Sequence, residues 1–283
     1  MTLTGGSSVE GNVKYVNIRA SSALSRSGLP GLDYALNPYV GCYHKCAYCY
    51  ARSYCRYEEP RKRWGDVIYV KENLVELLRS EVRRVRPGIV GLSTITDPYQ
   101  PIEAVTRLSR RCMEILLKAG FRVSIQTKSS LALRDLDLLA GASKLVDVGF
   151  TITSLDDTLV RKVETRAPPP SARVKALREI SEVGVRTWVF LGPIIPGLND
   201  DLSQLEGVIS IAGETNSVLY YDWLRFKGEL REFFNSLGLE PAQYLRSSAQ
   251  LGWRKTVEDK ILRMCRERNV LCEPAFTEYS LQQ

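Results

Sequence analysis

The stretch that decides the fold is NPYVGCYHKCAYCYAR, residues 37–52. It holds Cys42, Cys46 and Cys49, three of the seven cysteines of the chain, together with its single histidine, His44. A hydrophobic core does not require such crowding of thiols and imidazole. Clustered thiols in one short loop more often hold metal or carry out redox chemistry. The stretch therefore predicts a metal centre.

Composition sets broad limits on the class of protein. The 283 residues are 44% hydrophobic, which is enough for a substantial core. The net charge of +7 suits a polyanion such as nucleic acid, although a solvated charged surface explains it as well. No apolar run approaches the roughly 20 residues that cross a bilayer, and the N-terminus lacks an apolar secretory segment. We expect a cytoplasmic protein without membrane contact.

Short apolar runs alternate with amphipathic helical patterns along the chain. Strands are predicted at residues 88–94, 122–128, 146–152, 186–192 and 217–223, with a first strand inside residues 33–42. Helices are predicted at residues 74–85, 102–119, 171–183, 200–212 and 255–268. Repeated strand–helix units form a parallel sheet, and six of them form an α/β fold of the partial (β/α)6 barrel type. The chemistry of such folds sits at the carboxyl ends of the strands.

We expect one barrel core, residues 36–226, with a short extension at each end. Residues 1–35 form the N-terminal extension, and residues 227–283 form a C-terminal helical cap with a closing strand at 269–273. Both extensions are expected to cover the barrel rather than to fold as separate domains.

The three cysteines form a C-x3-C-x2-C motif with Tyr48 before the last one. Three thiolates from one loop can hold three corners of a [4Fe–4S] cluster and leave one iron open. This motif resembles that of the radical S-adenosylmethionine (SAM) enzymes, whose fold is a six-unit partial barrel. Four segments most resemble the spore-photoproduct-lyase-like branch: NPYVGCYHKCAYCYAR, TITDPYQPIE, IQTK and GPIIPGLND. The similarity runs from about Ser22 to Arg225.

The resemblance implies a [4Fe–4S] cluster and SAM as cofactors. It also implies an external electron donor of the ferredoxin or flavodoxin type, whose electron cleaves SAM to a 5′-deoxyadenosyl radical. The radical then takes a hydrogen atom from a substrate that the sequence does not identify, with nucleic acid as one candidate. Because such a radical is highly reactive, the barrel must enclose it.

Polar residues at successive strand ends are the expected SAM contacts. The resemblance assigns Thr96 and Asp97 to the methionine ammonium, and a cation at Lys128 can pair with the carboxylate. Thr151 and Thr153 could bond the ribose or carboxylate, and Tyr48 could flank the adenine through its main chain. Each has a plainer alternative, since Asp97 before a proline can start a turn and Lys128 can be a solvated charge.

The sequence resembles the fold motifs of spore photoproduct lyase, but it lacks a residue that the reaction of that enzyme requires. That enzyme uses a cysteine as hydrogen donor just before the Ser/Thr-Asp pair, and Thr94 stands at this place here. The alcohol O–H bond of Thr94 is too strong to replace S–H as a donor to a carbon radical. DNA photoproduct repair is therefore kept as an alternative to a reaction on an unidentified substrate. Tyr50 and Tyr99 are the residues expected to line the path of the radical.

Three further features of the sequence have alternative interpretations. Cys42, His44, Cys46 and Cys49 could hold zinc in a non-enzymatic nucleic-acid-binding protein, although donors at alternate positions require an unusually tight loop. Two arginine-rich runs, residues 58–66 and 79–86, could contact phosphate or could be solvated faces. The remaining cysteines are expected to be buried, with a second cluster or a disulfide as alternatives: Cys55, Cys112, Cys265 and Cys272.

Overall fold

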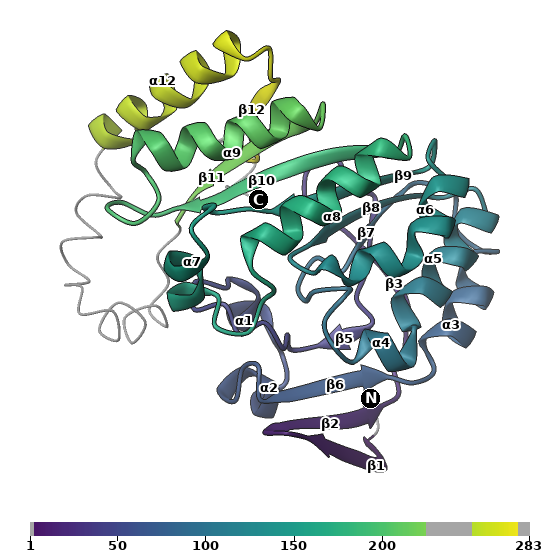
Figure 1. Ribbon diagram of the computed structural model, residues 1–283. Helices are drawn as coiled ribbons and strands as arrows, with labels where there is room; N and C mark the ends of the chain where they lie inside the picture. Colours follow the sequence, from purple (N-terminus) through teal and green to yellow (C-terminus); the bar gives the residue numbers. More distant parts are fainter. Residues whose placement is uncertain (1–2, 225–250, 277–283) are drawn as a thin grey trace.

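The computed structural model describes residues 3–224 and 251–276 (Figure 1). Two sheets are present in this part of the chain, one of eight strands and one of four. The larger sheet carries six parallel strands in chain order: β4 (Tyr34–Leu36), β7 (Ile89–Leu92), β8 (Arg122–Thr127), β9 (Val146–Thr151), β10 (Arg186–Ile194) and β11 (Val218–Trp223). The predicted α/β partial-barrel architecture is confirmed.

One more strand extends the larger sheet at each edge. β12 (Cys272–Pro274) pairs parallel to β11, and β3 (Leu24–Arg26) pairs antiparallel to β4. The closing strand thus exists but lies slightly later than the predicted residues 269–273.

Helices line one face of the larger sheet, because each has an apolar side to bury (Figure 1). They are α3 (Leu74–Glu81), α5 (Leu108–Lys118), α6 (Leu136–Gly141), α8 (Pro170–Glu182), α9 (Leu202–Glu214) and α12 (Leu251–Glu267). Strand β9 is buried along its whole length, as a parallel strand covered on both faces should be. The core is therefore continuous between the sheet and these helices.

Two predicted elements are divided in the structure. The first strand, placed within residues 33–42, is split into β4 and β5 (Tyr39–Val40), which join different sheets. The helix predicted at residues 102–119 is broken at Arg107, whose φ of 48° ends α4 (Glu103–Thr106) before α5 begins. A residue in the left-handed region interrupts the helical hydrogen-bond pattern, so periodicity alone did not reveal the break.

The N-terminal extension takes part in the smaller sheet. β1 (Leu3–Glu10) and β2 (Val13–Ile18) form an antiparallel pair, and β2 pairs in parallel with β6 (Val67–Lys71), a strand that the sequence reasoning missed. β5 completes this sheet on the other side of β6. Because β5 leads directly into the cysteine loop, the smaller sheet supports the start of that loop.

The C-terminal segment packs through α12, which contacts α9. A disulfide joins Cys265 on α12 to Cys272 on β12, so the structure places these two thiols in a bond rather than in a cluster. Of the proposed cap, residues 227–250 and 277–283 lie outside the described residues. Across residues 3–224 and 251–276, no helix has the length and apolar character needed to span a membrane.

Candidate active site

The cysteine loop lies at the carboxyl end of β4, where a parallel α/β fold places its chemistry. Gly41 enters the loop with a φ of 84°, and a Cβ there would lie 2.7 Å from the carbonyl oxygen of Val67. Only glycine allows both this backbone and this close approach to β6. Cys42 and Cys46 are buried and Cys49 is partly exposed, so the loop presents its thiols inward.

The pKa values of all three thiols are raised, and burial is the largest cause in each case. Burial raises the pKa of Cys42 most, and the charges of Asp97, Cys46 and Cys49 add to the effect. Burial also raises the pKa of Cys46 to about 12, against the lowering influence of Lys128. Thiolates in such a place need positive charge, and bound iron supplies it, because a coordinating thiol is deprotonated outright. The donor set therefore fits an iron–sulfur cluster.

The same donors do not fit a single zinc ion. Zinc needs four ligand atoms at about 2.0–2.3 Å from one point. Among the described residues, no group of three or more His, Cys, Asp or Glu side chains is arranged to hold one metal ion. In a four-iron cluster each thiolate binds a different iron, so the thiols need not converge. His44 is instead turned toward Asp97, with Nδ1 3.3 Å from Oδ2.

Asp97 is a buried junction between the ends of two strands. Its Oδ1 accepts hydrogen bonds from Tyr99 N–H (2.9 Å) and the Thr127 hydroxyl (2.8 Å), and its Oδ2 accepts one from Lys128 N–H (2.9 Å). Burial alone would raise the pKa of Asp97, but His44 and these donors lower it to about 2. The carboxylate thus joins the cysteine loop, through His44, to the carboxyl ends of β7 and β8.

Lys128, the predicted SAM-binding cation, lies beside the cysteine loop, and its assignment to SAM stays a prediction. Its Nζ lies 5.6 Å from the ring centroid of Tyr48, within cation–π range. Burial disfavours the ammonium, yet the charges of Cys46 and Glu164 raise the pKa of Lys128 above its ordinary value. A positive charge is therefore held next to the thiols.

Tyr48 is fixed by two residues that the sequence reasoning missed. Its hydroxyl donates to Glu164, and Glu164 pairs with Arg173 of α8. Both partners of this ion pair are fully buried. A charge on the buried face of α8, in register with Leu177 and Ile180, was the available signal in the sequence.

The three threonines that were predicted to contact SAM follow or end strands of the larger sheet. Each forms a hydrogen bond to another residue of the protein. The Thr96 hydroxyl donates to Gly41 O (2.6 Å), which braces the entry to the cysteine loop. The Thr151 hydroxyl accepts from Gln126 (3.1 Å), and the Thr153 hydroxyl donates to Glu164 (3.2 Å). Their assignment to SAM stays a prediction.

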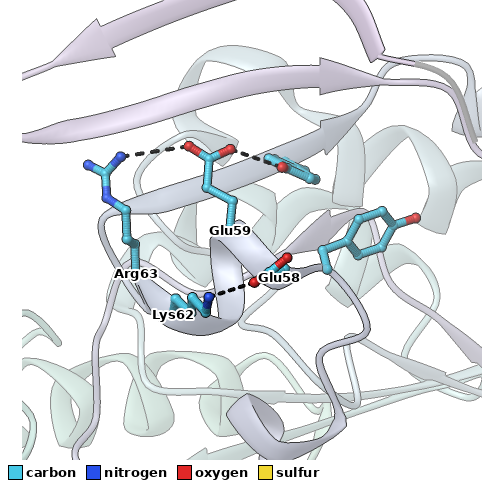
Figure 2. A pocket seen from close by; sticks show the side chains of 6 residues that line it. Glu58, Glu59, Lys62 and Arg63 are labelled. Atoms are coloured by element: carbon cyan, nitrogen blue, oxygen red, sulfur yellow. Dashed lines mark hydrogen bonds and ion pairs between the residues drawn. The ribbon is translucent and has the colours of Figure 1, made fainter.

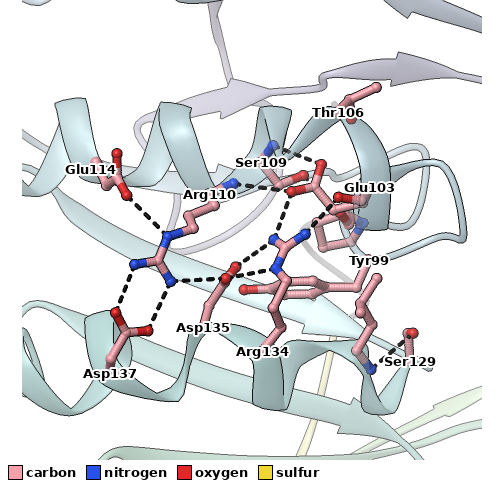
Figure 3. A network of polar contacts seen from close by, with 12 residues as sticks. Tyr99, Glu103, Thr106, Ser109, Arg110, Glu114, Ser129, Arg134, Asp135 and Asp137 are labelled. Atoms are coloured by element: carbon pink, nitrogen blue, oxygen red, sulfur yellow. Dashed lines mark hydrogen bonds and ion pairs between the residues drawn. The ribbon is translucent and has the colours of Figure 1, made fainter.

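The two predicted catalytic tyrosines have different surroundings. Tyr50 is 50% exposed, and its hydroxyl donates to the carbonyl oxygen of Thr94. Tyr99 is fully buried, with the guanidinium of Arg134 5.9 Å from its ring centroid. Figure 3 shows Tyr99 within a polar network of α4, α5 and the segment around Asp135. The structure thus leaves only Tyr50 of the two accessible from outside.

A loop of inward thiols at the carboxyl edge of a six-stranded partial barrel defines the class of radical SAM proteins. The sequence model of the Radical SAM superfamily matches residues 36–225 of this chain. The chain belongs to this superfamily and is a radical SAM enzyme.

Its relatives include proteins without a described activity. An uncharacterised protein of Methanocaldococcus jannaschii is 32% identical over 250 residues, which cover 88% of this chain and 92% of the relative. An uncharacterised protein of Mycobacterium tuberculosis is 34% identical over 235 residues, 78% of this chain and 68% of the relative. A phage protein (Pseudomonas phage M6) named radical SAM Nalpha-GlyT isomerase is 25% identical over 193 residues, 65% of this chain and 38% of the relative.

Solved structures share the fold. Spore photoproduct lyase complexed with dinucleoside spore photoproduct matches with a TM-score of 0.69 and 15% identity, over 93% of this chain and 82% of that one. Streptococcus suis SuiB bound to S-adenosylmethionine matches with a TM-score of 0.56 and 13% identity, over 86% and 50%. The fold is thus like that of spore photoproduct lyase, as the sequence motifs suggested.

Proposed function

We propose that Cys42, Cys46 and Cys49 hold a [4Fe–4S] cluster that, with bound SAM, supplies a 5′-deoxyadenosyl radical for hydrogen abstraction. The observation that carries the proposal is a short loop of three free thiols, two of them buried, next to the ammonium of Lys128. Superfamily membership supports the same cofactors.

The surrounding residues would orient SAM rather than react. Lys128 is the group for the methionine carboxylate, because its ammonium is held beside the thiols. Tyr48 would flank the adenine through its main chain, and Thr151 and Thr153 lie at the end of β9 where the ribose is expected. Asp97 has protein partners on both oxygens, so we assign it to positioning His44 and the Lys128 backbone as well as to the ammonium of SAM.

We consider two candidates for the reaction and its substrate. The main proposal leaves the substrate unidentified, with nucleic acid as a candidate partner. The second candidate is DNA photoproduct repair, which the fold similarity to the lyase favours. Thr94 argues against the repair reaction, because its hydroxyl cannot replace the thiol as a hydrogen donor. The Thr94 hydroxyl also accepts a hydrogen bond from Asn37 Nδ2 (3.4 Å). A ferredoxin- or flavodoxin-type protein is the proposed electron donor, and the reducing cytoplasm is the proposed location.

The test is anaerobic reconstitution with iron and sulfide, followed by reduction with dithionite in the presence of SAM. We expect about four irons per chain, absorption near 400 nm, and release of 5′-deoxyadenosine. Cys46→Ala should lose both iron and product. Cys55→Ala is the matched control, since Cys55 is also a buried free cysteine but lies outside the motif.

Two results separate the candidates. Cleavage of thymine photoproduct in DNA would favour the repair reaction, and stimulation of 5′-deoxyadenosine release by cell extract alone would favour another substrate. A protein that binds zinc instead of iron, or that loses as much iron through Cys55→Ala as through Cys46→Ala, would contradict the proposed cluster site.

A further inference from the structure

The two arginine-rich runs of the sequence differ in how their charges are used. In the first, Lys62 pairs with Glu58 (2.5 Å) and Arg63 pairs with Glu59 (3.7 Å), as Figure 2 shows. Trp64 is only 6% exposed, so its ring is not available to stack on a base. Two of the three cations of this run are therefore paired within the protein, and only Arg61 is exposed without an ion pair among the described residues, so the run offers less to a polyanion than the second one does.

The second run keeps its positive charge. Arg79, Arg83, Arg84 and Arg86 lie at the end of α3 and in the segment that leads to β7, and all four are exposed. In the described part of the chain, none of the four forms an ion pair with Asp or Glu. Exposed guanidinium groups without carboxylate partners are free to contact an external anion.

The fold adds a fifth arginine from a distant part of the sequence. The carboxylate of Glu81, in the last turn of α3, accepts hydrogen bonds from the backbone N–H groups of Ala23 (2.9 Å) and Leu24 (2.8 Å). This contact holds the start of β3 against the end of α3. As a result, Arg26 of β3 is exposed close to Arg84 and Arg86 of the second run.

Three of these five arginines line a hollow at the surface. Its volume is about 530 Å³, and Arg26, Arg84 and Arg86 line it together with Asp33 and Tyr34. The guanidinium of Arg26 lies 5.0 Å from the centroid of the Tyr34 ring, which holds it in place.

One carboxylate is part of the same hollow. Oδ2 of Asp33 accepts the backbone N–H of Ile89 (2.7 Å), so this acid is already bonded to the chain. Three guanidinium groups against one carboxylate leave the hollow with a net positive charge. The neighbouring helix α3 carries two acidic residues, Glu76 and Glu81. The carboxylate of Glu81 is already hydrogen-bonded to the backbone at the start of β3.

The hollow lies on the opposite side of the barrel from the cysteine loop. Asp33 and Gly88 directly precede β4 and β7, so the hollow is at the amino ends of these strands, whereas the cysteine loop follows the carboxyl end of β4. A ligand here would not enter the reactive mouth. The site is thus separate from the proposed SAM site.

We propose that the hollow lined by Arg26, Arg84 and Arg86 binds the phosphodiester backbone of a nucleic acid without reading its sequence, with Arg79 and Arg83 of the same run as further exposed positive charges. The planar guanidinium matches two phosphate oxygens, and a row of such groups suits a repeating anion. A protein partner fits this hollow less well than a nucleic acid. Protein interfaces are usually centred on buried apolar side chains, whereas the exposed residues here are arginines. The inference does not depend on the reaction at the cysteine loop.

The experiment measures binding of the cluster-loaded enzyme to a fluorescent 30-base-pair DNA duplex of random sequence, without SAM, over a range of salt concentrations. The triple variant Arg26→Gln, Arg84→Gln, Arg86→Gln should bind about tenfold more weakly than wild type. The slope of log affinity against log salt should fall in magnitude by about 2 to 3, because about three phosphate contacts are lost.

A matched triple variant separates position from net charge. Arg63→Gln, Lys175→Gln, Arg178→Gln removes the same charge from exposed residues that are paired with Glu59, Glu179 and Glu214. It should bind within about twofold of wild type. Equal weakening in both triple variants, or unchanged affinity and slope in the first, would overturn the proposal. Thermal unfolding of each variant shows that a loss of binding is not a loss of folding.

Discussion

Arg173 and Glu164 form an ion pair in which both side chains are completely buried beside the cysteine loop. Arg173 also donates to the carbonyl oxygens of Pro168 (2.8 Å) and Thr151 (3.0 Å), so its guanidinium joins α8, β9 and the segment before α8. Glu164 in turn accepts the Tyr48 hydroxyl and forms an isolated antiparallel bridge with Cys46. The cysteine loop is therefore anchored to the barrel by a buried charge pair.

Removal of one partner of this pair should strongly destabilise the protein. Arg173→Met leaves the Glu164 carboxylate buried without its counter-charge, and we expect a loss of about 3 to 5 kcal/mol in the free energy of unfolding. Urea unfolding of the cluster-loaded enzyme measures it.

Arg178→Met on the same helix is the control, because Arg178 pairs with Glu214 in a largely exposed position. It should cost no more than about 0.5 kcal/mol. The double variant Arg173→Met, Glu164→Gln should recover part of the loss, since no unpaired charge then remains. Equal costs for Arg173→Met and Arg178→Met would mean that the buried pair has no special role.

Tyr50 and Tyr99 should differ in their effect on turnover. Tyr50 is exposed beside the cysteine loop, whereas Tyr99 is fully buried in a separate polar network. With a turnover assay for the substrate, Tyr50→Phe should lower the rate by about a hundredfold, as misplacement of a group that lines the path of the reacting atoms can do. Tyr99→Phe should leave the rate within about twofold.

Stability provides the internal control for these tyrosines. The buried Tyr99 hydroxyl lies near Asp135 but forms no hydrogen bond of good geometry among the described residues, so its removal should change the free energy of unfolding by no more than about 1 kcal/mol. A large loss of turnover in a stable Tyr99→Phe enzyme would place the radical path through Tyr99 instead.

The packing between β9 and β10 gives a third prediction. A Cβ at Gly149 would lie 2.2 Å from ring atoms of Trp188, whose indole N–H donates to Asp147 (2.8 Å) and thus resists movement. Gly149→Ala should therefore destabilise the protein by about 1 to 3 kcal/mol in thermal or chemical unfolding. Gly141→Ala, at the end of α6 with open space around it, is the control and should not destabilise. A similar cost at both positions would contradict the steric argument.

The sequence predicted the repeating elements better than the contacts between distant segments. Apolar runs and helical periodicity located the six parallel strands, because both patterns are local. β6 was missed although Val67–Lys71 is a short apolar run like the others, and its place in the second sheet depends on pairing with β2, about 50 positions away. The cysteine motif was visible because its spacing is local too. Glu164 and Arg173 were not assigned to the site, because no spacing indicated that the fold would bring Glu164 beside Tyr48.

Lys71 should make stability depend on pH in a defined window. It ends β6, and burial lowers its pKa from the ordinary 10.5 to about 8. Between these values the unfolded chain binds a proton that the folded protein has lost, so the contribution of Lys71 to the free energy of unfolding rises with pH. Below about pH 8 both states are charged, and the folded state bears the full cost of burying the ammonium.

Lys71→Met removes this cost. The variant should be more stable than wild type at pH 7, and the difference should shrink as the pH rises from about 8 toward 10.5. Urea unfolding of both proteins at several pH values measures the difference. Lys175→Met, which removes an exposed lysine of α8, controls for the loss of one positive charge. A difference between Lys71→Met and wild type that stays constant over this window would show that Lys71 keeps its proton in the folded protein.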